Sequence, residues 1–266
     1  MKVGFIGAGN MGGAILRGYL TSGKIQPKEV FVCGRDMEKL NKLSRELGIT
    51  ACKTIPELVE QCEVIMIGVK PNLFSEIMPQ VSKEYKNNKI LVSMAAGITI
   101  DSIQQYVGED AKIIRVMPNT PAMVNEAMTS VSRNRNVTQE QFAPVFDIFQ
   151  SIGRAEEVDE QLIHCVIGVS GSSPAYTYMY IDALAEAAVK NGMNKEQAII
   201  FAAQSVLGAA KMVLETGTDP VQLRINVCSP GGTTIEAVET LQQQGFAELV
   251  AAGFQAAVDK SKIMSK

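Results

Sequence analysis

A glycine-rich run near the beginning of the chain constrains the fold more than any other feature of the sequence. Residues 7–12 read Gly-Ala-Gly-Asn-Met-Gly, the GxGxxG spacing, between an apolar run at residues 3–6 and a helical pattern at residues 11–21. The first glycine permits a tight turn, the second lets the backbone approach a pyrophosphate, and the third lets the helix pack closely on the strand. In this strand–turn–helix context the motif predicts a dinucleotide site. The residues expected to contact the dinucleotide here are Ile6, Gly7, Ala8, Gly9, Asn10, Met11 and Gly12.

Short β-branched runs alternate with amphipathic stretches as far as residue 117. The runs expected to form strands are residues 3–6, 30–33, 49–52, 64–69, 90–94 and 112–117. Because continuous apolar runs alternate with helical patterns, they predict a parallel sheet that is covered on both faces. An edge strand at residues 128–132, a helix at 139–152 and a last short strand at 155–158 complete this part of the chain.

The sequence changes character near residue 160. Beyond it the chain is rich in Ala, Leu, Met, Gln and Glu, and the helices expected are residues 174–190, 195–215, 220–227, 234–243 and 246–261. Ala and Gly on the apolar faces of the first two allow helices to approach one another closely. The sequence therefore predicts an α/β N-terminal Rossmann-type dinucleotide-binding domain, residues 1–160, and an all-α C-terminal domain, residues 161–266.

Composition and charge argue against several classes of protein. Hydrophobic residues make up 46% of the 266 residues, which is enough for a large core. The net charge is −3 and no long basic run occurs, so neither a nucleic acid nor a membrane is the expected partner. The strongest apolar run, residues 64–69, is far too short to span a bilayer, and the glycine motif occupies the place of a signal peptide's apolar region.

Cysteine and histidine usage points to a reduced compartment and to a site without metal. The five cysteines are odd in number and have no CxxC spacing, which argues against a disulfide framework or a zinc site. We therefore expect a cytoplasmic protein. His164 is the only histidine, so metal sites built on several histidines are not expected.

The end of the second strand bears on which dinucleotide is bound. NAD-specific sites place an acidic residue there, but here Gly34 stands at that position and Arg35 follows it. A guanidinium suits a ribose 2′-phosphate, so NADP(H) is favoured and NAD(H) is the alternative. Asp36 leaves two interpretations open, because it either caps the next helix or turns toward the ribose.

Three further segments follow strand ends, where open α/β sheets bind their ligands. Lys70 either touches a phosphate or ribose or is an ordinary surface lysine. A stiff loop with prolines on both sides of Asn119-Thr120 could hold polar groups near a nicotinamide. The cofactor contacts expected in these segments are Gly68, Val69, Lys70, Pro71, Ala95, Ala96, Gly97 and Asn119.

Two helix starts stand out in the C-terminal part. In the first, Ser173 has the place of an N-cap and Pro174 that of the first turn. In the second, Ser-Pro-Gly-Gly at residues 229–232 precedes Thr233, which has capping-box spacing to Glu236. The two glycines leave backbone amides open, so this segment is interpreted either as an anion cradle with two hydroxyls or as a plain cap.

Taken together, these segments resemble the pyrroline-5-carboxylate reductase family over essentially the whole chain. The Ser-Pro-Gly-Gly-Thr-Thr run is much more specific to that family than the glycine motif. The resemblance implies that the substrate carboxylate and ring nitrogen lie at Ser229, Pro230, Gly231, Gly232, Thr233 and Thr234. It also implies that Asn226 lies near the cofactor, and that an interlocked dimer, often built into larger rings, shares its active site between two chains. Two positions depart from the family pattern, Ser173 in place of glycine and Ile55 in place of a polar residue.

The reaction that the resemblance implies is the NAD(P)H-dependent reduction of L-1-pyrroline-5-carboxylate to L-proline. A cyclic imine arrives protonated, so the protein needs mainly to orient the ring, and the Thr234 hydroxyl would bond the ring nitrogen and relay a proton. One alternative is a β-hydroxyacid dehydrogenase-like oxidoreductase, with Lys211 as its lysine, although Glu215 stands where that class has asparagine. The other is a non-catalytic dinucleotide-sensing module.

Overall fold

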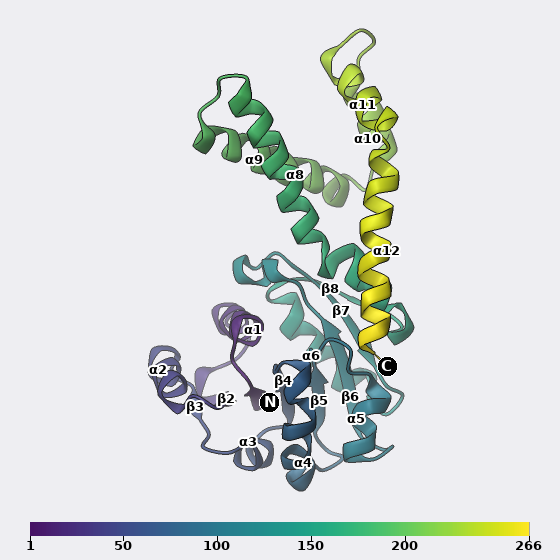
Figure 1. Cartoon of the computed structure of the whole chain (residues 1–266). Coiled ribbons are helices and arrows are strands. Elements are labelled where there is room, and N and C mark those ends of the chain that lie inside the picture. The colour runs from purple at the N-terminus through teal and green to yellow at the C-terminus, as the bar shows by residue number, and fades with distance from the viewer. Residues whose placement is uncertain (266) are drawn as a thin grey trace. The chain divides into compact units, whose positions relative to one another are not determined.

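The computed structural model describes residues 1–265 and divides the chain into two compact units (Figure 1). One unit contains Met1–Ser172 together with the chain from Ala257 onward, and the other contains Ser173–Ala256. The first unit extends past residue 160, where the sequence changes character. It does so because Ile163 is buried and because the Glu160 carboxylate binds the buried Arg115 at 2.9 Å.

The first unit is built on one eight-stranded sheet of order β3-β2-β1-β4-β5-β6-β7-β8. The strands are β1 (Val3–Ile6), β2 (Val30–Cys33), β3 (Thr50–Ala51), β4 (Val64–Ile67), β5 (Ile90–Ser93), β6 (Lys112–Met117), β7 (Ala127–Arg133) and β8 (Gly153–Glu157). All neighbours pair in parallel except β6 and β7, which are antiparallel. The parallel sheet is therefore confirmed over its first six strands. The prediction that residues 128–132 form an edge strand is wrong, because β8 pairs with the outer side of β7.

Helices cover both faces of this sheet, as the apolar strands require. Val64 and Met66 of β4 belong to one core cluster, and Ile65 and Ile67 to the other. The first cluster packs under α1 (Asn10–Thr21), α2 (Met37–Leu47) and α6 (Gln139–Gln150). The second packs under α3 (Ile55–Gln61), α4 (Phe74–Glu84) and α5 (Ile100–Val107). A strand that is buried on both sides has no polar positions, which is why its sequence shows no alternation.

A helical run that the sequence did not predict joins the sheet to the second unit. It consists of the 3-10 turn η4 (Glu160–Leu162), α7 (Ile163–Val166) and a π-helical turn, η5 (Ile167–Gly171). The next helix, α8 (Ser173–Lys190), follows almost directly. Ser173 is therefore not an N-cap, because Ser172 before it is already in the right-handed helical region.

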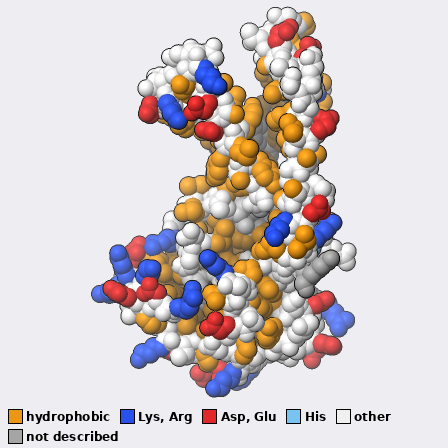
Figure 2. All heavy atoms as spheres, in the orientation of Figure 1, with side chains coloured by type: hydrophobic (Ala, Val, Ile, Leu, Met, Phe, Trp, Pro, Cys, Tyr) orange, Lys and Arg blue, Asp and Glu red, His pale blue; other side chains and the backbone are white. Residues whose placement is uncertain are grey.

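The second unit contains α8, α9 (Lys195–Thr216), α10 (Pro220–Val227), α11 (Thr233–Gln243) and the first part of α12 (Phe246–Met264). Its fully buried residues are the small ones Ala185, Ala198 and Ala202, and many of its large apolar side chains are exposed. Figure 2 shows such side chains on the visible face of this unit. Among residues 1–265, α9 alone is long and apolar enough to cross a membrane, by length and composition only.

Candidate functional site

A cavity of about 400 Å³ opens at the carboxyl ends of β1, β2 and β4. Two backbone hydrogen bonds fix its floor: Gly7 N–H donates to Cys33 O at 2.8 Å, and Gly68 N–H donates to Ile6 O at 2.9 Å. Residues from four separate stretches of the sequence meet here. The lining residues are Ile6, Gly7, Gly9, Cys33, Gly34, Arg35, Lys53, Thr54, Ile55, Gly68, Val69, Lys70, Leu73, Glu76, Ile77 and Gln80.

The glycine turn has the geometry that a bound pyrophosphate needs. Gly7 has φ +92°, a conformation that other residues rarely adopt. A Cβ atom at Gly9 would meet nothing within 4 Å, so the backbone there is open to a ligand. A Cβ at Gly12 would lie 2.4 Å from Gly7 O, so the third glycine is required for the helix to pack on the turn. These residues fit a dinucleotide phosphate at the beginning of α1.

The carboxylate nearest to the end of β2 is held away from the cavity. Asp36 Oδ1 accepts a hydrogen bond from Lys39 N–H at 3.1 Å, and its other oxygen lies 3.2 Å from Lys39 Nζ. Asp36 is therefore the N-cap of α2, which decides between the two interpretations of this residue. Arg35 lines the cavity and Asp36 does not. Burial raises the pKa of Cys33, so its thiol stays neutral and forms part of the wall.

Several cavity residues were not anticipated from the sequence. Lys53 and Thr54 follow β3 after one intervening residue, Cys52, and β3 has only two residues, so its end is difficult to locate in the sequence. Glu76, Ile77 and Gln80 lie on one side of α4, three and four residues apart, and that spacing is their only sequence signal. Ile55, one of the two positions that depart from the pattern of the resemblance, is 9% exposed and contributes an apolar wall to the cavity.

Five of the expected cofactor contacts in the glycine and lysine motifs do not line this cavity. Ala8 and Asn10 line a second hollow, of about 560 Å³, beside α1. Met11 packs against the core, Gly12 is buried beneath the turn, and Pro71 begins the 3-10 helix η2 (Pro71–Leu73). Gly12 and Pro71 thus shape the backbone of the cavity without lining it.

The Ala95–Gly97 segment and Asn119 lie farther along the sheet. Ala95 is 2% exposed, whereas Ala96 and Gly97 line a third hollow of about 280 Å³ with Met117. Asn119 is 8% exposed; its amide donates to Ser170 O at 3.0 Å and accepts from Met128 N–H at 2.9 Å. Asn119 therefore connects the π-helical turn to the beginning of β7, and we interpret it as a residue that positions these two segments.

Ser229–Thr234 form a separate group on the second unit, between α10 and α11. Gly232 N–H donates to Ser229 O at 3.0 Å, and Gly231 has φ +69°, so the chain turns sharply before the helix. The N-cap of α11 is Gly232, and Thr233 is already its first helical residue. The prediction that Thr233 caps this helix is therefore wrong. Since glycine has no side chain, the amides of the first turn keep their capacity to bind an anion.

Two side chains of this group differ in exposure. Thr234 is half-buried and Thr233 is exposed. On α10, Asn226 is exposed, and its Oδ1 accepts a hydrogen bond from Gln222 Nε2 at 2.8 Å. The N–H₂ group of the Asn226 side chain has two N–H donors, and these are available to a ligand.

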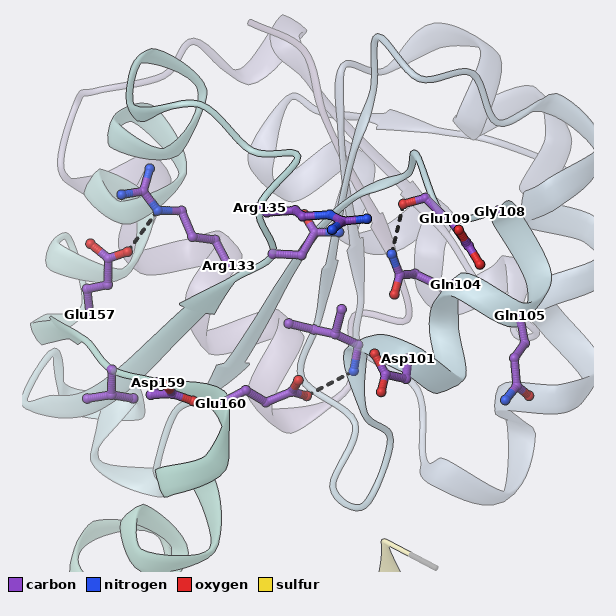
Figure 3. Close-up of a pocket in the computed structure, with 13 residues that line it drawn as sticks. Asp101, Gln104, Gln105, Gly108, Glu109, Arg133, Arg135, Glu157, Asp159 and Glu160 are labelled. Atoms are coloured by element: carbon purple, nitrogen blue, oxygen red, sulfur yellow. Dashed lines mark hydrogen bonds and ion pairs between the residues drawn. The ribbon is translucent and has the colours of Figure 1, made fainter.

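Another cavity of the first unit, of about 1150 Å³, is a charged groove between α5 and the ends of β7 and β8 (Figure 3). Glu160 Oε1 accepts from Ile100 N–H at 2.9 Å, and Arg133 Nε donates to Glu157 Oε1 at 2.8 Å. The residues that the sequence singled out do not line it. Within the described part of the chain, no cluster of three or more His, Cys, Asp or Glu side chains could hold a metal ion.

Two protein-family models match this chain, one in each half of the sequence. A family model described as pyrroline-5-carboxylate reductase dimerisation matches residues 160–264, and one described as NADP oxidoreductase coenzyme F420-dependent matches residues 2–97. The pyrroline-5-carboxylate reductase of Escherichia coli (strain K12) is 46% identical over 265 residues, which cover 100% of this chain and 98% of the relative. That of Arabidopsis thaliana is 39% identical over 267 residues, covering 100% and 96%.

Solved structures of pyrroline carboxylate reductases also match this chain. The pyrroline-5-carboxylate reductase structure from Coxiella burnetii has a TM-score of 0.94 at 33% identity and covers 100% of this chain and 98% of its own. The Plasmodium falciparum pyrroline carboxylate reductase, solved with NADP bound, has a TM-score of 0.89 at 31% identity, with the same coverage. The match runs through both the Rossmann-type unit and the helical unit. This chain belongs to the pyrroline-5-carboxylate reductase family.

Proposed function

We propose that this chain reduces L-1-pyrroline-5-carboxylate to L-proline and that NADPH is its preferred hydride donor. The observation that carries the proposal is the cavity at the ends of β1, β2 and β4, in a chain related over its full length to pyrroline-5-carboxylate reductases. NAD(P)H, when bound, supplies the hydride. The preference for NADPH is supported by Arg35 in the cavity and by Asp36, whose carboxylate is engaged as the cap of α2.

The substrate carboxylate is assigned to the beginning of α11. Gly231 and Gly232 let a ligand approach the backbone, and the first-turn amides together with the helix dipole favour a negative charge. Ser229 and Pro230 form the turn that presents these amides. Anion binding at this helix start would orient the ring, which is the main requirement for a substrate that arrives as a protonated imine.

Thr234 is assigned the catalytic contact. Its hydroxyl can accept a hydrogen bond from the iminium N–H and, after reduction, remain bonded to the ring nitrogen. Because reduction discharges a cation, no strong acid is required, and proton exchange with water through the hydroxyl is sufficient. Asn226, the last residue but one of α10, is assigned a contact to the cofactor through its amide N–H₂ group.

The dimerisation model over residues 160–264 supports a homo-oligomer. The assembly proposed is a homodimer, or a ring of dimers, in which the exposed apolar faces of the second unit meet a second copy of the chain. The same arrangement assigns the apolar surface of α9 to a protein partner and not to a membrane. The proposed location is the cytoplasm, and no nucleic acid is proposed as a partner.

The test is NADPH oxidation against a panel of pyrroline-5-carboxylate, pyrroline-2-carboxylate and piperideine-6-carboxylate, together with NADP⁺ reduction by 3-hydroxyacids. Turnover confined to 3-hydroxyacids would favour the β-hydroxyacid dehydrogenase alternative, and binding without turnover would favour a sensor. At the site, Thr234→Ala should lower kcat by roughly tenfold or more, whereas Thr234→Ser retains much of it. Thr233→Ala is the matched control, because Thr233 is exposed and does not cap the helix.

A further inference from the structure

We propose that Lys53, at the end of β3, is a second cationic residue for the 2′-phosphate of NADP(H), acting beside Arg35. The proposal rests on the NADPH preference stated above and assigns a further specificity-determining residue to it. The ligand group concerned is a phosphomonoester on the adenosine ribose. Lys53 follows β3, whereas sequence motifs place the discrimination between NADP(H) and NAD(H) at the end of β2.

The sheet places Lys53 and Arg35 at the same edge. β2 and β3 are parallel neighbours (Figure 1), with Val32 opposite Ala51, and Cys52 N–H donates to Val32 O at 2.8 Å. The residues that follow the two strands therefore emerge side by side, about 5 Å apart at the strand ends. Both Arg35 and Lys53 line the 400 Å³ cavity.

Both cations are available to a ligand. Among residues 1–265, no carboxylate forms an ion pair with the Arg35 guanidinium or with the Lys53 ammonium. The backbone N–H of Lys53 donates to Glu57 Oε2 at 2.8 Å, which fixes the main chain and leaves the ammonium group free. Lys39, by contrast, is occupied by Asp36.

A third cation, Lys70, belongs to another part of the ligand. It follows β4, and β1 lies between β4 and β2 in the sheet. Two strand spacings separate it from the end of β2, on the order of 10 Å. Lys70 therefore lies toward the glycine turn and its pyrophosphate, while Lys53 lies on the outer side of Arg35.

The charge on the ligand explains why two cations discriminate. A phosphomonoester carries about −1.5 to −2 charges at pH 7, whereas the 2′-hydroxyl of NAD(H) carries none. Arginine holds two phosphate oxygens in a fixed fork, and lysine adds a mobile point charge. The Lys53 contribution should therefore act on 2′-phosphorylated nucleotides and weaken with increasing salt.

The test is isothermal titration of the full-length protein with NADP⁺, NAD⁺, 2′,5′-ADP and 5′-AMP. Lys53→Met should raise the Kd for NADP⁺ and 2′,5′-ADP about tenfold at low ionic strength, and leave NAD⁺ and 5′-AMP within about twofold. Lys53→Arg should retain most of the affinity. Lys86→Met is the matched control, because Lys86 is also exposed and lies outside the cavity.

Each other outcome has a distinct meaning. If Lys53→Met weakens NADP⁺ and NAD⁺ equally, Lys53 contacts a shared part of the nucleotide and the proposal is overturned. If Lys53→Met is silent while Arg35→Ala weakens only NADP⁺, the proposal is overturned and the NADPH preference stands. If the wild-type protein binds NAD⁺ as tightly as NADP⁺, the cofactor preference itself fails.

Discussion

Replacing Gly12 by alanine tests whether the close packing of α1 on the glycine turn is required for nucleotide binding. A Cβ at Gly12 would lie 2.4 Å from Gly7 O, and real Cβ atoms essentially never come closer than 3.0 Å. The neighbouring atom is backbone, so the turn or the helix has to move. Gly13 provides the matched control, because a Cβ there would lie 3.4 Å from Ala8 O, an ordinary contact.

The magnitude follows from the comparison of the two variants. Both positions are helical, so alanine gains about 1 kcal/mol of helix propensity at each, and this gain cancels between them. What remains is the overpacking at Gly12, which costs about 1–3 kcal/mol. We expect Gly12→Ala to be less stable than Gly13→Ala by that amount. A displaced turn also moves the amides that face the pyrophosphate, so the Kd for NADP⁺ should rise about tenfold or more.

The assay is urea unfolding of both variants at one fixed protein concentration, since the stability of an oligomer depends on concentration. Titration with NADP⁺ gives the affinities. If the two variants unfold at the same urea concentration and bind NADP⁺ equally well, the packing argument for the third glycine is wrong. Loss of binding by Gly13→Ala alone would place the ligand along the other side of α1.

Three further predictions concern an ion pair and a histidine of the first unit, and the assembly of the chain into oligomers. Glu160→Gln keeps an oxygen for Arg115 and Ile100 N–H but removes the charge opposite a guanidinium that is 2% exposed, so the free energy of unfolding in urea should fall by about 3 kcal/mol. Glu156→Gln breaks an exposed pair and should cost less than about 1 kcal/mol. Burial, followed by the charges of Arg115 and Lys262, lowers the pKa of His164 below 6.5, against the opposing effect of Glu160. The folded state therefore favours the neutral ring. The stability that this preference contributes is fully present above pH 6.5, and it is lost as the pH falls through the pKa of His164 in the folded state. Unfolding curves at pH 7.5 and 5.5 should differ less for His164→Gln than for the wild type. Finally, Ile200 is 66% exposed on α9, and Ile200→Glu should shift the protein toward monomers in light scattering, with loss of activity; an active monomer would contradict the proposed assembly.

The sheet could be predicted from the sequence because its signal is local. The first six strands are short apolar runs, and each is separated from the next by a helix with its own ends, such as Gly48 with φ +70° after α2. The dinucleotide cavity follows from the same topology, because parallel strands bring residues 6–9, 34–35 and 68–70 to one edge. Lys53 was missed because β3 has only two residues, too few for periodicity to define where it ends.

Features that depend on tertiary contacts could not be predicted in this way. Val166, Ile167 and Val169 are β-branched, yet they lie in α7 and in the π-helical turn that follows it, and one carbonyl of that turn, Ser170 O, is bound by the Asn119 side chain. Glu160, which is distant in sequence, holds both Arg115 and the beginning of α5. At Thr233 the capping-box spacing was present but was not used, because Gly232 takes the N-cap position and the chain turns through Gly231 first.

The helical unit shows the limit of reasoning from a single chain. Helices that are apolar on most sides are normally buried, yet here only alanines are fully buried while Met179, Phe201 and Leu249 are each more than half exposed. Such side chains stabilise a fold only when another surface covers them. The match of residues 160–264 to the dimerisation family model indicates that this surface belongs to a second copy of the chain. The residues assigned to the substrate lie in this same unit. Helix-capping rules alone leave a plain cap as one interpretation of Ser229–Thr234, whereas the family resemblance assigns this segment to the substrate, a proposal that the Thr234 variants test.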